Sequence, residues 1–77
     1  MERYKNLGGD SGVSAFEIGD TLIKIKFKTS SAIYVYTNMK TGQHHVEKMK
    51  ELASRGTGLQ AYVNHHKGMR FDKEHLA

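Results

Sequence analysis

Histidine is the residue type with the widest chemical repertoire in this chain, and five histidines occur in 77 residues. Four of them form two adjacent pairs, His44-His45 and His65-His66. Imidazoles bind metal ions and transfer protons near neutral pH. Adjacent residues on a helix point about 100° apart, so one ion would need, for example, His45 and His66 to meet between antiparallel helices, with a third ligand. The chain has no cysteine and no His-x3-His spacing, so we predict no metal site and no cofactor.

The acidic and hydroxyl residues show no spacing that supports catalysis. Glu17, Asp20 and Asp72 are isolated between apolar residues or glycines, and a turn role accounts for Asp20. Ser14 and Ser54 have no neighbouring histidine with a third partner. A chain of this length also has little room for a pocket that buries a substrate. We therefore predict no catalytic residues and no enzymatic activity.

Positive charge is concentrated in the middle of the chain. Residues 21–40 contain four lysines, Lys24, Lys26, Lys28 and Lys40, and no acidic residue. A clustered basic stripe is typical of proteins that bind phosphate groups, although lysines also guard exposed strands against aggregation. Further along, the second histidine pair is followed by two more cations that could add to a phosphate-binding edge at mildly acid pH. These cations are Lys67 and Arg70.

The composition bounds the class of protein. The strongly apolar residues Leu, Ile, Val and Phe sum to 16 of 77, so the core must be small and its residues well placed. With no cysteine, stability rests on packing alone. No apolar run is long enough for a membrane span or reads as a signal peptide. The composition excludes a disulfide scaffold, a membrane span and a multi-domain enzyme, and it predicts a cytoplasmic protein.

Three segments of the first half have the pattern of β-strands. Residues 21–28 alternate between Ile23, Ile25, Phe27 and three lysines, the period-two pattern of a strand with one buried face. Residues 13–18 and 32–37 are the neighbouring candidates, the second rich in β-branched and aromatic residues. Strands so close in sequence favour an antiparallel meander.

The second half changes to a helical period. One helix is predicted around Val46, Met49, Leu52 and Ala53, with Thr41 as N-cap and Gly56 at its end. A second runs from a capping box at 57–60 to about Gly68, and Phe71 is a candidate to pack back onto the domain. The predicted fold is α+β: a three-stranded antiparallel β-meander followed by two α-helices packed on one face, in the order β-β-β-α-α. The predicted domain covers 13–71, between a flexible lead-in at 1–12 and a tail at 72–77.

The hairpin between 21–28 and 32–37 can close in two registers. A two-residue loop pairs Ile25 with Tyr34 and places both Tyr34 and Tyr36 on the core face. A three-residue loop pairs Ile25 with Val35 and places both tyrosines beside the lysines. A slip of one residue moves every side chain to the other face of the sheet. We favour the three-residue loop, because it separates all the strand's apolar residues from Lys24, Lys26 and Lys28.

In the favoured register, the lysines and tyrosines of the hairpin form one exposed face. Its members are Lys24, Lys26, Lys28, Tyr34 and Tyr36. Single-stranded RNA binders combine such rings, which stack on bases, with cations that hold the backbone. The alternative interpretation is cross-strand lysine–tyrosine packing that only stabilises the sheet.

Tyr34-Val35-Tyr36 carries a family resemblance. A Tyr-x-Tyr at the end of a short β run, followed by an amphipathic helix, resembles the KTSC domain. This is a stand-alone bacterial module that is also found at the C-terminus of some lysyl-tRNA synthetases. Ile25-Lys26-Phe27 is similar to the apolar-x-Phe strand of that family, and residues 58–64 to its Gly-Leu-Asn-x-Phe-Ile-Asn segment. The similarity runs from about Val13 to Phe71.

The chain also departs from the family pattern. Residues 53–56 match its Ala-x-Ser-x-Gly region with altered spacing. Ser30-Ser31 stands where the family usually has a turn glycine, and Met39-Lys40 where it usually has a proline. The association with a synthetase implies an RNA-related role.

Together, these features predict a small non-catalytic accessory module that binds RNA through a basic and aromatic sheet face. The candidate contacts are Lys24, Lys26, Lys28, Tyr34, Tyr36, Lys40, Lys67 and Arg70. The candidate ligand is tRNA or single-stranded RNA, with no membrane involved. The alternative is a protein-interaction module that pairs through a strand edge or forms a homodimer.

Overall fold

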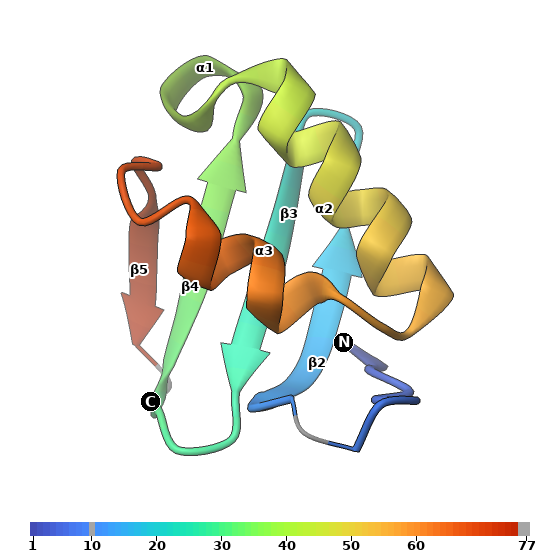
Figure 1. The fold of residues 1–77 in the computed structure, drawn as a ribbon. Coiled ribbons are helices and arrows are strands. Elements are labelled where there is room, and N and C mark those ends of the chain that lie inside the picture. The colour runs from blue at the N-terminus through green and yellow to red at the C-terminus, as the bar shows by residue number, and fades with distance from the viewer. Residues whose placement is uncertain (10, 76–77) are drawn as a thin grey trace.

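The computed structural model describes residues 1–9 and 11–75. The strands of a five-stranded antiparallel sheet lie side by side in chain order (Figure 1). Along the chain, three helices come between the fourth and fifth strands. The elements are β1 (Glu2–Arg3), β2 (Val13–Ile18), β3 (Leu22–Phe27), β4 (Ala32–Thr37), α1 (Asn38–Thr41), α2 (Gln43–Arg55), α3 (Leu59–His65) and β5 (Asp72–His75). The predicted α+β class with an antiparallel sheet is confirmed. The sheet has two strands more than predicted, and the described residues include one more helix.

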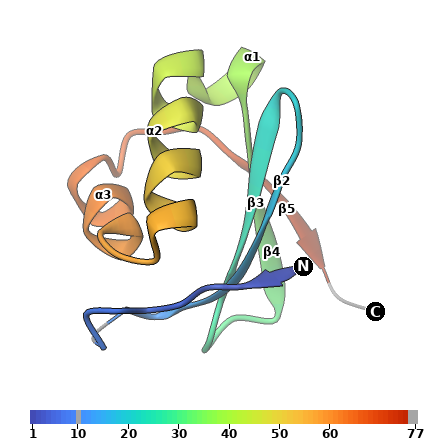
Figure 2. The same cartoon turned by 90° about the vertical axis from the view of Figure 1, so that its right-hand side faces the viewer.

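The helices α2 and α3 cover one face of the sheet, and the described residues place no helix on the opposite face (Figure 2). The alternation in β3 explains this division, because Ile23 and Ile25 are fully buried under the helices. From α2, Val46, Met49 and Ala53 meet them at helical spacing. The core cluster contains Tyr4, Val13, Phe16, Ile23, Ile25, Tyr36, Val46, Met49, Ala53, Leu59 and Met69. None of the helices within residues 1–9 and 11–75 has the length and apolar character needed to cross a membrane.

Glycines set both ends of α2. Gly56 adopts the left-handed conformation and donates its backbone N–H to the carbonyls of Leu52 and Ala53, as predicted for a helix end. At the start, the N-cap is Gly42 and not Thr41. Instead, Thr41 closes α1, a four-residue helix that the periodicity did not reveal.

The predicted capping box at 57–60 does not form. The N-cap of α3 is Gly58, which is left-handed at φ 86° and has no side-chain cap. Thr57 therefore lies one residue too early to cap the helix. Gln60 accepts a hydrogen bond from the backbone N–H of Gly12 (3.1 Å) and so ties α3 to the start of β2.

The two additional strands lie in segments predicted to flank the domain. β1 belongs to the predicted lead-in, and it is followed by Tyr4, which is only 3% exposed and accepts a hydrogen bond at its hydroxyl from the N–H of Leu59 (3.3 Å). β5 belongs to the predicted tail, whose last two residues lie outside the described residues. Both strands are short and largely charged, so neither has the apolar alternation that signals a strand in sequence.

The predicted three-residue loop between β3 and β4 is wrong. Ile25 pairs with Tyr34 and Ile23 with Tyr36, which is the two-residue alternative. Directly opposed residues share a face, so both tyrosines lie on the side that the helices cover. The lysines of β3 lie on the other side, where Lys24 is opposite Val35.

The fifth strand explains why this register is preferred. Phe71, just before β5, packs its ring 5.0 Å from Tyr34 and 5.5 Å from Tyr36, between ring centroids. These aromatic contacts exist only when the tyrosines face the helices. β5 also makes β4 an inner strand, so Val35 becomes buried on the face without helices. Phe71 lies outside the hairpin, so the residues of the hairpin alone favour the wrong register.

Candidate nucleic-acid interface

The lysines of β3 are held by contacts within the protein. Lys24 forms a salt bridge with Glu74 of β5, with Nζ 3.1 Å from Oε1. Lys26 donates from Nζ to the carbonyl of Phe27 (2.6 Å) and to the carbonyl of Ser30 in the turn. A phosphate would have to compete with these partners for either ammonium group.

The two predicted stacking tyrosines are covered. Tyr36 is 2% exposed, and burial, with the neighbouring Tyr34 in second place, raises the pKa of its phenol to about 12. Tyr34 is half-buried, with one stacked ring contact to Phe71 and an edge contact to Phe27. Because these rings and Lys24 lie on opposite faces, the predicted lysine–tyrosine surface does not form.

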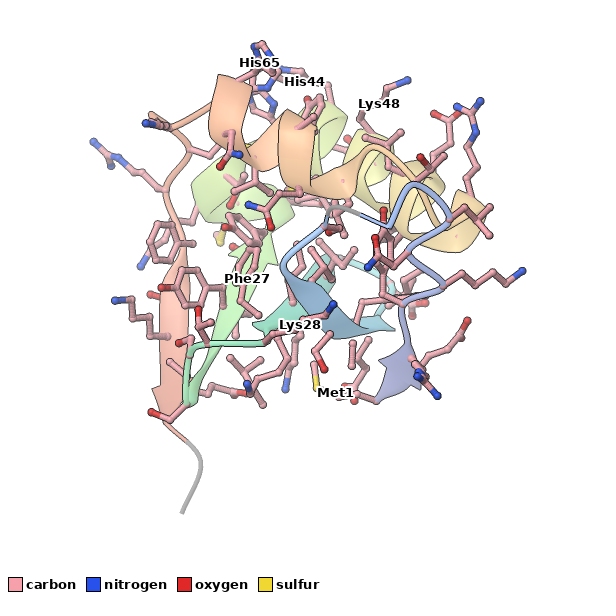
Figure 3. The ribbon with its side chains drawn as sticks, turned by 60° about the horizontal axis from the view of Figure 1, so that its bottom comes forward. Met1, Phe27, Lys28, His44, Lys48 and His65 are labelled. Atoms are coloured by element: carbon pink, nitrogen blue, oxygen red, sulfur yellow. The ribbon has the colours of Figure 1, made fainter. Side chains whose placement is uncertain are left out.

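A histidine cluster forms where the start of α2 meets the end of α3. The rings of His45 and His66 are 5.1 Å apart between centroids, and His44 lies 4.0 Å from His45. Tyr62 lies between the two helices and stacks on His66 at 4.1 Å. Figure 3 labels His44 and His65, which mark these two helix ends.

Tyr62 holds both inner imidazoles through their Nδ1 atoms. Its hydroxyl is 2.7 Å from Nδ1 of His45, and its backbone carbonyl accepts a hydrogen bond from Nδ1 of His66 (2.9 Å). The Nε2 atom of each ring remains for other contacts. Burial, followed by the proximity of His44 and His66, lowers the pKa of His45.

A surface pocket of about 320 Å³ opens beside this cluster. Its lining residues are Lys40, Thr41, His45, His66, Gly68, Met69 and Arg70. Four of these side chains are basic, and we call the site the basic pocket. Lys40 also forms a salt bridge with Asp72 at 2.5 Å, and the Thr41 hydroxyl donates to the carbonyl of Arg70. These contacts join α1 to the segment before β5 and so close the pocket on one side.

A second, smaller pocket of about 170 Å³ adjoins the basic pocket and shares His66 and Met69 with it. Its lining residues are Tyr34, Tyr36, Val63, Asn64, His66, Lys67, Met69 and Phe71. We call it the aromatic pocket. Phe71 is its most open ring, with 37% of the residue exposed. A cationic site and an aromatic site therefore lie side by side.

The predicted contact residues thus separate into different parts of the molecule. Lys40 and Arg70 line the basic pocket, and Lys67 lines the aromatic pocket. Lys28 is exposed, but it lies beside β1 and the start of β2, in another pocket. The second histidine pair was predicted to lie at a phosphate-binding edge with Lys67 and Arg70. Only His66 of this pair lines the two pockets, because His65 lines neither.

The sequence predicts that Phe71 packs back onto the domain, and the structure confirms this, but the sequence does not predict that its ring lies beside the cations. The bonds of Tyr62 to two histidines depend on how α3 crosses the start of α2, which no local pattern specifies. The adjacency of Arg70 and Phe71 in a segment without pattern was the one available signal. Among the described residues, no group of three or more histidine or acidic side chains is placed to hold a metal ion.

Comparisons with known proteins found no relative of this chain. A scan of protein-family models, a search of curated proteins and a search of solved structures gave no match. The resemblance to the KTSC domain therefore stays a prediction.

Proposed function

We propose that this chain is a non-catalytic RNA-binding module that contacts RNA at the edge formed by α1, the start of α2 and the segment from α3 to β5. A cytoplasmic location and an accessory role next to RNA-handling enzymes, which the KTSC resemblance implies, are parts of this proposal. The proposed interface lies at this edge and not on the sheet face, because the tyrosines are covered and lie on the opposite face from Lys24 and Lys26.

One observation carries the proposal: the basic pocket and the aromatic pocket adjoin and share His66 and Met69. Proteins that bind single-stranded nucleic acid combine cations for the phosphates with rings on which bases stack. Arg70 and Phe71 are consecutive, so a phosphate at one and a base at the other lie within the span of one nucleotide. The supporting cations are Lys40 and Lys67.

The test is fluorescence anisotropy with a short single-stranded RNA and with tRNA at several salt concentrations. We expect log K to fall with log salt by about 0.7 for each phosphate contacted on single strands. Replacing Arg70 by Gln should weaken binding about tenfold, the loss typical of one charge-assisted hydrogen bond. Replacing Phe71 by Leu should remove a stacking contribution and leave the salt dependence unchanged.

Lys48→Gln is the matched control. Lys48 is exposed on α2, where it pairs with Glu51 at 3.4 Å, and it lines neither pocket (Figure 3). Its loss removes the same charge as Arg70→Gln outside both pockets. Equal weakening by both substitutions would show only a general charge effect, and no binding of either RNA at low salt would overturn the proposal.

A second candidate function, protein interaction, is favoured by one observation on α1. Met39 is 97% exposed beside a pocket of about 530 Å³ that it lines with Thr21, Thr37, Asn38 and Gln43. An exposed apolar side chain beside a surface pocket is suited to contact another protein.

This second candidate is tested by light scattering of the isolated chain. A homodimer that uses Met39 should dissociate on the Met39→Glu substitution. A particle of about 8.7 kDa at high protein concentration, the mass of one chain, excludes the homodimer version.

A further inference from the structure

We propose that the basic pocket recognises a phosphate monoester at the end of an RNA strand, with the terminal base against Phe71. This inference rests on the proposed RNA-binding function and specifies its ligand. It follows from the convergence of four basic side chains on one pocket beside a single open ring.

The charge of the basic pocket suits a terminal phosphate. Lys40, His45, His66 and Arg70 all line one pocket of about 320 Å³. An internal phosphodiester carries one negative charge, whereas a phosphate monoester carries about −1.5 to −2 at pH 7 and has three acceptor oxygens. Converging donors serve one such group, whereas a passing strand would need its cations spread along a path. The one carboxylate bonded to these cations among the described residues is Asp72, which a stronger anion would displace from Lys40.

The two imidazoles are arranged in advance for an anion. Tyr62 engages the Nδ1 atom of both His45 and His66, at 2.7 and 2.9 Å. Tyr62 thereby fixes the orientation of each ring. Nε2 of His45 can donate even when this ring is neutral, whereas Nε2 of His66 donates only when its ring is protonated. Donors held by supporting hydrogen bonds lose little conformational freedom on binding.

The aromatic pocket limits the number of bases that can stack on the protein. Phe71 is the most exposed Phe or Tyr residue in residues 1–9 and 11–75, with 37% of its surface exposed. Binders of running strands stack successive bases on several rings. A single exposed ring beside the basic pocket can stack on one base, which suits the last nucleotide of a strand with its terminal phosphate.

The experiment uses one short single-stranded RNA in three forms: with a 5′-phosphate, with a 3′-phosphate, and with hydroxyl groups at both ends. Each carries the same internal fluorophore, and binding is followed by anisotropy with the full chain. We expect one phosphorylated form to bind at least about tenfold more tightly than the hydroxyl form, as one additional charge-assisted contact provides. The form that binds more tightly identifies which end is recognised.

Two variants separate the phosphate from the base. Arg70→Gln should abolish the preference for the phosphorylated end and weaken competition by inorganic phosphate. Phe71→Leu should weaken RNA binding but leave competition by inorganic phosphate unchanged. Lys48→Gln should retain the preference, and amide NMR spectra of all three variants establish that each is folded.

The outcomes distinguish this inference from the function on which it rests. Equal affinity for all three RNA forms, with Arg70→Gln weakening each alike, overturns end recognition and leaves RNA binding standing. Binding of none of the three overturns both. A preference for the phosphorylated end that survives Arg70→Gln also overturns the inference, because the phosphate is then bound elsewhere.

Discussion

At the scale of single residues, Tyr62 organises the edge of the molecule. Its hydroxyl and its backbone carbonyl bind two different histidines, and its ring stacks on His66. Burial raises the pKa of the Tyr62 phenol, so the hydroxyl keeps its proton at neutral pH and can donate to Nδ1 of His45. A neutral His45 then accepts at Nδ1 and carries its own proton on Nε2. The protonation of His45 therefore changes the charge of the basic pocket.

The first prediction concerns stability in mildly acid solution. The folded protein holds the pKa of His45 below its ordinary value of 6.5, so folding favours the neutral ring. The stabilisation is present above the unfolded pKa and is lost as the pH falls toward the folded pKa. The groups facing His45 are His44, His66, Tyr62, Lys40 and Arg70. Denaturant unfolding between pH 7.5 and 5.5 should show the loss, and His45→Asn should reduce it more than His65→Asn, which changes a histidine outside the Tyr62 bonds.

A related prediction is that an anion in the basic pocket raises the pKa of His45. NMR titration of the imidazole protons with and without inorganic phosphate measures this change. An unchanged His45 titration in the presence of saturating phosphate contradicts the assignment of this ring to the site.

The third prediction concerns alkaline solution. The pKa of Tyr36 is raised to about 12 in the folded chain, against an ordinary value of 10.0. A group whose folded pKa is raised stabilises the fold below its unfolded pKa and ceases to do so as the pH passes through the folded pKa. The free energy of unfolding should therefore decline between pH 10 and 12. Tyr36→Phe should flatten that decline, apart from a smaller contribution of the same sign from Tyr62, and a variant with an unchanged slope would contradict it.

At the scale of elements, the sequence predicts those helices and strands whose own residues carry a clear pattern. β3 follows from alternation and β4 from its β-branched and aromatic residues, and α2 ends at Gly56, which adopts the left-handed conformation. The hairpin register could not be predicted from the hairpin, because Phe71 decides it from the other end of the domain. β5 itself is a charged segment that becomes a strand only by pairing with β4. Tertiary pairing overrides weak local preference at such places.

Gly56 provides the fourth prediction, which tests the end of α2. Its φ of 80° is left-handed, and an added Cβ would lie 2.7 Å from Cβ of Lys5, closer than real contacts allow. Gly56→Ala should therefore lower the free energy of unfolding by at least about 1–2 kcal/mol, the cost of the left-handed conformation alone. Gly68→Ala is the control, because an added Cβ there meets nothing within 4 Å. Chemical denaturation compares the two, and equal destabilisation would contradict the prediction.

At the scale of the whole molecule, the candidate site belongs to one end of a two-layer sandwich (Figures 1 and 2). Residues 40–45, 62–66 and 69–71 are separate in sequence and meet only when the helices lie across the sheet. The sequence identifies Lys40, Lys67 and Arg70 as cations and predicts Lys67 and Arg70 at a phosphate-binding edge, but it does not bring the three together. Their true neighbours depend on the crossing of α2 and α3, which no local pattern specifies. The sequence therefore identifies the basic residues of the candidate site, but not which of them lie next to one another.

The position of β5 has a consequence for motion. β1 to β4 follow one another directly, whereas β5 returns to β4 only after three helices, and it lies at the edge of the sheet. Two surface salt bridges, Lys24–Glu74 and Lys40–Asp72, help to hold it, and exposed pairs contribute little. Amide hydrogens of β5 should therefore exchange with solvent faster than those of β3, through an opening that leaves the core folded. Undocking β5 would carry Phe71 and Arg70 away together, so a bound ligand should slow exchange in β5 by holding the strand closed.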